Sequence, residues 1–429
     1  MEEFSNCTLG VDYAFGPVVQ NDCRGGFDFT LLFERSILTL LPAAVFLLTF
    51  LVRFAQLLRA DIKTSENPLR VAKLWTALLF VALQVALLVL YTRDRSTSSS
   101  VSIAAATVNL IVALHLIGLS WIEDSRSVKP STLLISYLLF TIFLDIPQAR
   151  SLWLLRANAT LEALAGVFSA SIAAKIALLL LETRQKRIYL KTEYQDLPPE
   201  STSGIINRSF LWWINDLFRR GFHALISIND LYQLDTKLTS SDLKLKLQRA
   251  WETRRRPERR VELAWALCRA LWWPLLQAVP PRLCNVALTM TQPFLISSVL
   301  SLVSEPDGDR ATANKGYGLI GATALIYLGL AVSDLHYSQV MNRCITMSRG
   351  ALVALIYDRA LQVPDGLYDE ATAVTLMSSD TTLIAQSLAT LHDVWALTIQ
   401  VAIGLFLLAR QVGWVCVMPV VVVVGTQDL

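Results

Sequence analysis

The sequence is poor in charged residues and in histidine. Asp, Glu, Lys and Arg make up 17% of its 429 residues, histidine occurs four times, and hydrophobic residues make up 54%. Soluble globular domains carry about 25% charged residues, so this composition excludes a soluble protein. The net charge of +3 is too small to indicate nucleic-acid binding. We therefore expect an all-α membrane protein with no nucleic-acid partner.

The motifs of nucleotide and metal chemistry are also missing from the sequence. No G-x-x-x-x-G-K-[ST] occurs, so the chain has no loop of glycine-freed amides and lysine to hold nucleotide phosphates. No His, Cys and carboxylate side chains have the spacing of metal ligands, and no nucleophile motif stands in a strand–turn–helix context. We therefore expect no catalytic residue, no metal and no cofactor in this chain.

Cysteine is scarce and scattered. Six cysteines are too few for a disulfide scaffold, and no pair has the close spacing of a zinc site. Cys7 and Cys23 share the segment before the first apolar run, where they either form a disulfide or remain free thiols. The chain starts MEEFSNCTLG, acidic and polar, whereas a cleavable signal peptide starts with basic residues. The first apolar run is therefore expected to stay in the mature protein.

Five apolar segments in the first half approach the length of about 20 residues that a membrane-spanning helix needs. A backbone in lipid must satisfy its own hydrogen bonds, so each segment is expected to be helical. The fourth is short and contains Asp145, and Lys175 in the fifth is expected to extend toward the inner interface. The five segments are 29–52, 74–91, 101–121, 132–146 and 161–181.

The distribution of basic residues predicts the orientation of these spans. Arg and Lys gather between the first two spans and after the fifth, and cytoplasmic loops are rich in these residues. The N-terminus is then outside. The sequons at Asn6 and Asn158 also face outward in this topology, where glycosylation can occur.

A polar connector follows the fifth span and contains the stretch 209–222, SFLWWINDLFRRGF. Its apolar residues recur at the i, i+3, i+4, i+7 spacing of a helix, with Arg219 and Arg220 on the other side. Ser209 is the expected N-cap and Gly221 the expected C-cap. Tryptophan prefers the head-group layer, which favours an interfacial helix; the alternative is an ordinary amphipathic helix on a soluble core.

A second amphipathic helix is expected in SDLKLKLQRAWETRRR. Ser241 is its expected cap, and Leu243, Leu247 and Trp251 recur at four-residue intervals. The basic tail of this segment suits an anionic inner leaflet.

A further set of apolar segments follows at 283–303, 317–340 and 383–408. The helical pattern continues between 342 and 382 but becomes polar, so the second helix of this set is expected to extend far into the cytoplasm. The last apolar run, 414–425, is about a dozen residues long and shorter than a span. We expect the chain to be a fragment or truncated product of a longer polypeptide.

The order of these parts carries a resemblance to a known family. Five spans, a connector with SFLWWINDLFRRG and INDLYQLD, and a later loop that reads LYDEATAVTLMSSDTTLIAQ follow one another. Over essentially its whole length the chain resembles fungal subfamily C ATP-binding cassette transporters, the multidrug-resistance-associated type. The resemblance implies an accessory five-span domain at 1–183, a lasso connector at 184–262 and a truncated first transport domain at 263–429. It also implies that ATP and Mg²⁺ serve the full-length family in nucleotide-binding domains that this chain lacks.

The same resemblance assigns residues to two regions. Ala371 and Thr375 depart from the family pattern, which has Gly and Asn at these positions. The implied lasso positions are Trp212, Trp213, Asn215, Gly221, Asp230 and Leu231, and the implied coupling-loop positions are Thr375, Leu376, Met377, Ser378 and Asp380.

Polar residues at membrane depth are candidates for a substrate path. Arg282 precedes the span that contains Gln292, and in the resembled family basic residues of the corresponding span meet anionic substrates; the alternative is an arginine that extends to the interface. Asp334 and His336 either line a polar cavity or form a solvated helix end. Trp395 either lines the cavity or anchors its helix at the interface.

Two functions from different classes fit the sequence. The first is the N-terminal part of an ATP-driven exporter of amphipathic organic anions, conjugates or secondary metabolites, in the plasma or vacuolar membrane. Its partners are the bilayer, the missing nucleotide-binding and second transmembrane domains, and the substrate. The second is a non-transporting adaptor, as in the sulfonylurea receptors of the same family, or a nonfunctional truncated transporter.

Overall fold

The computed structural model describes most of the chain as helix. The described residues are 15–16, 29–65, 67–93, 99–155, 159–195, 197–233, 235, 238–253, 262–304, 310–362, 364 and 370–413. Within them, eight helices are long and apolar enough to cross a membrane. The chain forms two compact units, Met1–Gln233 with Asp307–Lys315 and Leu234–Pro306 with Gly316–Leu429. Asn6, Cys7, Cys23, Asn158 and the run 414–425 lie outside the described residues.

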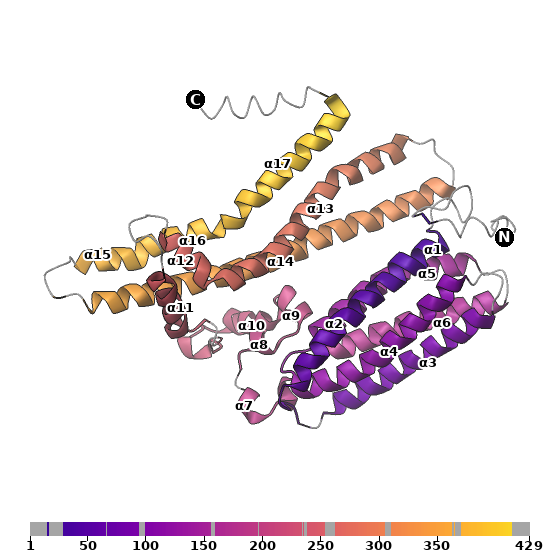
Figure 1. Ribbon diagram of the computed structural model, residues 1–429, viewed down its shortest axis with the longest axis horizontal. Helices are drawn as coiled ribbons and strands as arrows, with labels where there is room; N and C mark the ends of the chain where they lie inside the picture. The colour runs from indigo at the N-terminus through magenta and orange to yellow at the C-terminus, as the bar shows by residue number, and fades with distance from the viewer. Residues whose placement is uncertain are drawn as a thin grey trace. The chain divides into compact units, whose positions relative to one another are not determined.

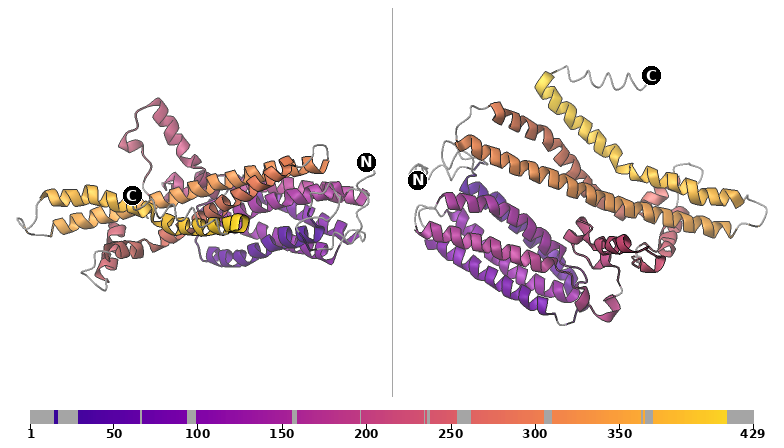
Figure 2. Two further views of the ribbon diagram at one scale, coloured as in Figure 1. Left: turned by 90° about the horizontal axis from the view of Figure 1, so that it is seen from above. Right: turned by 180° about the vertical axis from the view of Figure 1, so that it is seen from behind.

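The first unit contains the five expected spans, which are confirmed and longer than expected. The fourth continues to Leu154, well past the predicted end at 146. Helix α3 packs between α4 and α6, while α2 packs on α4 and α5 on α6 (Figures 1 and 2). The elements are α1 (Leu31–Phe33), η3 (Glu34–Leu40), α2 (Leu41–Leu58), α3 (Pro68–Arg93), α4 (Ser100–Arg126), α5 (Thr132–Leu154) and α6 (Ala159–Thr183).

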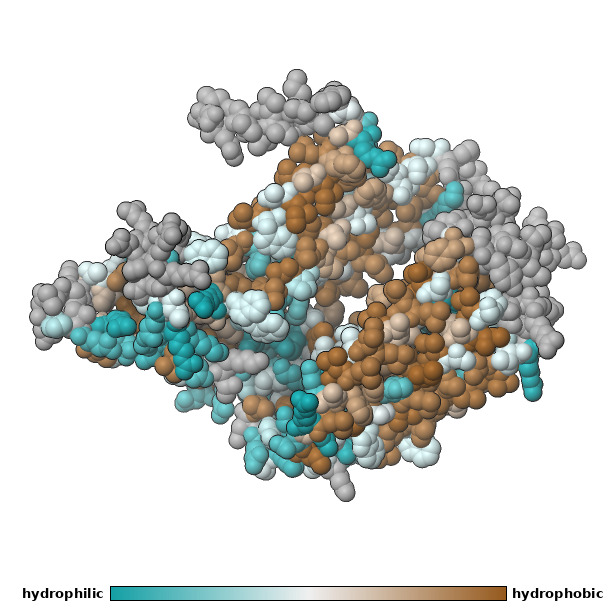
Figure 3. Space-filling model, viewed as in Figure 1, coloured by the Kyte–Doolittle hydropathy of each residue, from teal (hydrophilic) through white to brown (hydrophobic). Residues whose placement is uncertain are grey.

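The outer surface of this bundle is apolar. Leu48 and Trp75 are 69% and 70% exposed, and Figure 3 shows hydrophobic residues gathered over these helices. Inside, Phe46, Phe50 and Leu116 belong to a buried core between the helices. Large apolar side chains exposed on helices long enough to span a bilayer indicate that lipid surrounds this bundle.

The bundle interior also contains ionic side chains. The prediction that Lys175 extends toward the inner interface was wrong. Lys175 is buried and forms an ion pair with Asp145 of α5, and it does not extend to the interface. A carboxylate on the neighbouring helix gives the ammonium a counter-charge at membrane depth, where charged side chains pair with one another. Asp145 therefore belongs to the fourth span as a packing partner.

A second buried network lies at the start of the first span, where the helix widens to the π-helix η3. Arg35 donates to Gln148 at 3.0 Å and to Tyr91, and Ser151 donates to Glu34 at 2.6 Å. Pro42 lies two residues after the end of η3. Because proline has no N–H, it cannot donate a backbone hydrogen bond to the preceding turn, and a π-helical turn accommodates this missing bond.

An ionic cluster among the described residues joins α3, α4, α6 and the start of the connector at the opposite end of the bundle. Lys73 of α3 lies 3.1 Å from Asp124 of α4 and 3.0 Å from Glu182 of α6. Lys186, just after α6, lies 3.2 Å from Asp124, and burial lowers the pKa of this lysine. Arg70 completes the set, 3.2 Å from Asp124. The cluster ties α3, α4, α6 and the start of the connector together.

The connector is a series of short helical segments. The prediction of a single helix at 209–222 was therefore wrong. Leu211 has a φ of 54°, which breaks the stretch, and Ser209 ends one helix where it was expected to cap another. Gly221 lies inside the helix Asn215–His223, so the C-cap expected there was wrong, and a Cβ at this position would come within 2.7 Å of Cδ1 of Ile226. The elements are α7 (Thr192–Gln195), α8 (Pro199–Thr202), α9 (Ile205–Ser209), η5 (Trp212–Ile214), α10 (Asn215–His223) and η6 (Ile228–Asp230).

The second unit contains the later spans and their extension. Helix α14 has 51 residues, about 76 Å at 1.5 Å per residue, so the predicted extension beyond the membrane is confirmed in length. The expected third span is divided at Thr390 into two helices. The elements are α11 (Ser240–Glu252), α12 (Glu262–Ala270), α13 (Trp272–Ser304), α14 (Arg310–Ala360), α15 (Glu370–Thr375), η8 (Leu376–Asp380), α16 (Thr381–Ala389) and α17 (Leu391–Val412).

Helix α11 packs against α12 and α14 in the second unit. Leu243 and Leu247 join a buried core that includes Leu267 of α12 and Leu352 of α14. The predicted cap at Ser241 was wrong, since the helix begins at Ser240 with Thr239 before it.

This packing predicts the effect of truncating one leucine. Leu247 is 0% exposed, so Leu247→Ala is expected to destabilise the second unit by about 2–5 kcal/mol through lost contacts and a cavity. Leu245 on the same helix is 48% exposed, and Leu245→Ala is expected to change stability by about 0.5 kcal/mol or less. Thermal unfolding of both variants in detergent checks this, and equal shifts would contradict it.

Candidate functional site

A polar cluster lies where α13, α14 and α17 meet in the second unit. Arg282 on α13 is 15% exposed at its side chain, and its Nη2 lies 2.7 Å from Asp393 Oδ1 of α17. The guanidinium carbon is 5.1 Å from the ring centroid of Tyr337 on α14. The cation is therefore held by one carboxylate and one aromatic face from two other helices.

A histidine and a tryptophan complete this cluster. Trp395 donates its indole N–H to Nδ1 of His392 at 3.0 Å, and the His392 ring stands edge-on to Tyr337 with centroids 6.2 Å apart. An indole nitrogen only donates, so Nδ1 of His392 accepts and the neutral ring carries its proton on Nε2. The Tyr337 ring thus contacts Arg282, and His392 and Trp395 continue the cluster from Tyr337.

The structure brings together some of the predicted substrate-path residues and separates others. Arg282 and Trp395 belong to the one cluster. Gln292 lies ten residues farther along α13, about 15 Å by helix rise. Asp334 is exposed and lies one turn before Tyr337 on α14. His336, the residue directly before Tyr337, is half-buried. No observation shows a substrate at these residues, so the substrate path stays a prediction.

Asp393 is the member of the cluster that was not predicted from the sequence. Asp393 lies in the apolar segment 383–408, and a carboxylate in such a segment indicates a functional site or an ion pair. Its partner is about 110 residues away in the chain, and only the folded structure joins the two charges.

The predicted lasso residues occupy the exposed turns of the connector. Trp212 stacks on Phe210 with centroids 5.3 Å apart, and Trp213 faces Tyr232 at 6.3 Å. Asn215 begins α10, and Leu231 is exposed just after η6.

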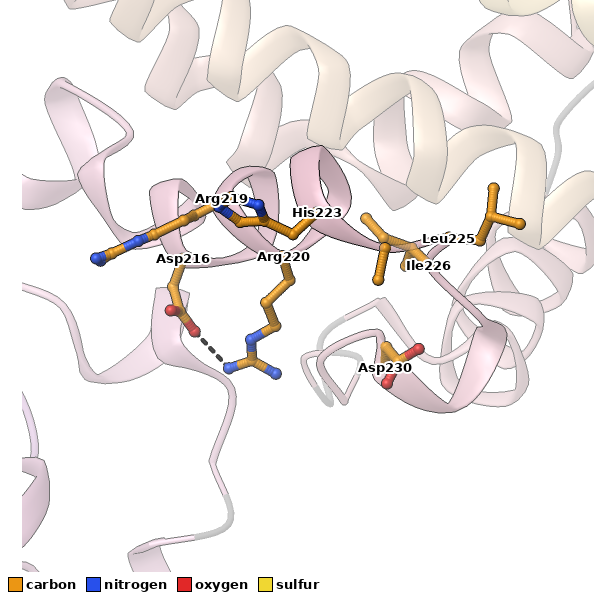
Figure 4. Close-up of a pocket in the computed structure, with 8 residues that line it drawn as sticks. Asp216, Arg219, Arg220, His223, Leu225, Ile226 and Asp230 are labelled. Carbon is orange, nitrogen blue, oxygen red and sulfur yellow. Dashed lines mark hydrogen bonds and ion pairs between the residues drawn. The ribbon is translucent and has the colours of Figure 1, made fainter.

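A shallow pocket lies between α10 and the turn at Asp230 (Figure 4). Arg220 pairs with Asp216 one turn earlier, as the dashed line in the figure shows. Asp230 accepts from the amide and hydroxyl of Ser227, and these hydrogen bonds hold the pKa of the Asp230 carboxyl below its usual range.

The apolar side chains of this region point away from any core in the described residues. Phe218, Phe222, Leu225 and Ile228 are all largely exposed. A short segment with so many exposed large apolar residues indicates a contact with lipid or with another protein surface.

The predicted coupling loop is helical. Thr375 ends α15, and Leu376, Met377, Ser378 and Asp380 form the π-helix η8 that leads into α16. Met377 lines a groove together with Gly350 and Tyr357 of α14. A role in coupling to a nucleotide-binding domain stays a prediction.

The geometry defines the class of protein first: a multi-pass helical membrane protein whose five-span unit precedes further long spans. Residues 13–165 match the ABC transporter TMD0 domain. The chain is 39% identical over 400 residues to ABC multidrug transporter B of Aspergillus fumigatus, covering 93% of this chain and 27% of that protein. It is 37% identical over 424 residues to ABC transporter FGM5 of Gibberella zeae, covering 98% of this chain and 28% of that protein.

A third relative extends this relationship within the fungi. ABC multidrug transporter lscH of Purpureocillium lilacinum is 35% identical over 432 residues, with 97% of this chain and 27% of that protein covered. The predicted resemblance to ABC transporters is confirmed: the chain carries a TMD0 domain and has fungal ABC transporters as homologues. It spans about a quarter of the length of these relatives.

Proposed function

We propose that the chain forms the N-terminal part of an ATP-driven exporter of subfamily C that moves amphipathic organic anions or conjugates across a membrane. The observation that carries the proposal is the position of Arg282, a cation held at the junction of three helices by the Asp393 carboxylate and the face of the Tyr337 ring. The relatives named as multidrug transporters support export of small molecules.

The cluster suits an amphipathic anion by its chemistry. A carboxylate or sulfate of the substrate replaces Asp393 as the partner of Arg282, because the guanidinium is 15% exposed and needs a counter-charge, whereas the displaced Asp393 side chain is 36% exposed. The Tyr337 and Trp395 rings offer apolar surface to the remainder of the substrate. ATP and Mg²⁺ bind in domains outside this chain and supply the energy for the conformational change.

The proposed orientation places the N-terminus outside and the ionic cluster of the first unit at the cytosolic side. Arg59, Lys63 and Arg70 lie between α2 and α3 or at the start of α3, and Arg184 and Arg187 follow α6. This distribution follows the excess of Lys and Arg in cytoplasmic loops. The membrane is the plasma or the vacuolar membrane.

Transport by the full-length transporter that contains this sequence tests the proposal. Inside-out vesicles that carry it are expected to take up a fluorescent glutathione conjugate only with ATP, and vesicles with residues 1–429 alone are expected to take up none. Absence of ATP-dependent uptake for carboxylate, sulfate and glutathione conjugates alike would contradict the exporter and favour an adaptor.

The Arg282–Asp393 pair predicts the effect of removing the carboxylate. Asp393→Asn removes the resident partner of Arg282, so the substrate anion no longer competes with it. KM for an anionic conjugate is expected to fall by about two- to fivefold, the size of one partly exposed ion pair. Initial uptake rates over a substrate series measure this, and an increased KM would contradict the competition.

A further inference from the structure

A buried hydroxyl without a hydrogen-bond partner lies in the Arg282 cluster. Tyr337 of α14 is 8% exposed, and its Oη has no partner among the described residues. The Nε of Arg282 is likewise buried and has no partner there, while Nη2 of the same guanidinium forms the ion pair with Asp393. Two unused hydrogen-bond donors therefore belong to residues that meet at this junction of helices.

The packing around Tyr337 explains why the protein leaves this hydroxyl unpaired. Tyr337 belongs to the buried core of the second unit together with Leu275 and Ala278 of α13, whose side chains offer no acceptor. The ring is held from two directions: its centroid lies 5.1 Å from the guanidinium carbon of Arg282, and the His392 ring stands edge-on to it. The tyrosine is thus fixed in position while its hydroxyl stays available.

The unused donors indicate the chemistry of the missing partner. Burying a hydroxyl without a hydrogen bond is unfavourable, and a phenylalanine would present the same ring face to Arg282 without this cost. Buried polar groups of native proteins are nearly always bonded, so a water molecule or a ligand is expected to complete the bonding here. Both unused groups can donate, and a negatively charged oxygen accepts such bonds better than a water molecule does.

We propose that the Tyr337 hydroxyl determines specificity by donating a hydrogen bond to an oxygen of the substrate anion beside Arg282. The inference rests on the proposed function, in which that anion takes the place of Asp393. Arg282 supplies the counter-charge, and Tyr337 adds a requirement for an oxygen acceptor, which carboxylates and sulfates both meet. A substrate without such an oxygen binds more weakly, because it leaves the buried donor unpaired.

Binding of a fluorescent glutathione conjugate tests the inference on the full-length transporter that contains this sequence. The transporter is placed in nanodiscs without ATP, and fluorescence polarisation of the conjugate gives the Kd. The variant is Tyr337→Phe, which removes the hydroxyl and keeps the ring. The matched control is Tyr327→Phe, since Tyr327 is a tyrosine of the same helix that is 57% exposed.

Tyr337→Phe is expected to bind the conjugate about tenfold more weakly, the size of one hydrogen bond to a charged group. Tyr327→Phe is expected to change the Kd by about twofold or less. Without substrate, the unfolding temperature of Tyr337→Phe is expected to be equal to or above that of the unsubstituted protein, because the lost hydroxyl has no partner in the described structure. An unchanged Kd, or an equal loss in both variants, overturns the proposal.

A second pair of variants separates a direct bond from an indirect effect. In an Asp393→Asn background, Tyr337→Phe is expected to weaken binding by the same factor, because the hydroxyl contacts the substrate itself. A loss confined to the protein that retains Asp393 would show that Tyr337 serves the displaced carboxylate, which also overturns the proposal. Tyr337-dependent binding without ATP-driven uptake would refute the exporter alone, whereas uptake with a Kd that does not depend on Tyr337 would refute this inference alone.

Discussion

Replacing Lys73 by methionine is expected to remove about 3–5 kcal/mol from the stability of the five-span unit. Lys73 is 1% exposed and contacts both Asp124 and Glu182, so its loss leaves buried carboxylates with too little positive charge. The effect is larger than that of a surface ion pair because the groups are removed from water, and an unpaired buried charge is costly.

Heat denaturation of the chain in detergent measures this effect. Arg59→Met is the control, since Arg59 is an exposed cation at the same end of the bundle, and its replacement is expected to shift the unfolding temperature little. A Lys73→Met variant as stable as this control would show that the cluster does not hold α3, α4 and α6 together.

Replacing Arg282 by alanine in the full-length transporter is expected to lower uptake of anionic conjugates by at least about tenfold. The substrate loses its counter-charge, and Asp393 is left at membrane depth without its partner. Arg282→Lys keeps the charge but not the planar fork, so it is expected to retain part of the activity. KM is expected to change more than the maximal rate.

Two comparisons separate this role from a loss of folding. Arg269→Ala removes an exposed cation of α12 and is expected to leave uptake unchanged. An uncharged substrate is expected to be less affected by Arg282→Ala than an anionic one. Unchanged export of organic anions by Arg282→Ala at equal protein levels would contradict the proposed role of the cluster.

The spans were predictable because the bilayer constrains length and hydropathy together. A run of about 20 apolar residues must be helical in lipid, and all five early spans and the long extension at α14 follow from that rule. Their ends were predicted too short, since helices continue through the polar residues of the head-group layer. Arg93 and Arg126, for example, still belong to α3 and α4.

The local breaks were less predictable because they depend on contacts and backbone conformations that hydropathy periodicity does not carry. The pattern at 209–222 is helical by periodicity, yet Leu211 takes a left-handed conformation that no pattern of apolar residues signals. Gly221 suits a C-cap by residue type, but it lies inside α10, close to the Ile226 side chain. Short segments with weak intrinsic preference take the conformation that tertiary packing favours.

The ionic partners of the candidate site were predictable as charges but not as pairs. Arg282 and Lys175 stood out as cations at membrane depth, and each pairs with a carboxylate on another helix. Which carboxylate pairs with which cation depends on helix rotation and register, and a single sequence does not fix either. An Asp at membrane depth therefore indicates that a Lys or Arg of another span is its ion-pair partner and does not extend to the interface.

The accessibility of the N-terminus in intact cells tests the membrane topology most directly, because the orientation of every span follows from it. An epitope tag before Met1 is expected to bind antibody without permeabilisation, and the chain is expected to stay in the membrane after carbonate extraction. A tag reachable only after the membrane is opened would contradict the proposed orientation, and a chain released by carbonate would contradict the insertion of these helices on which the transport site depends.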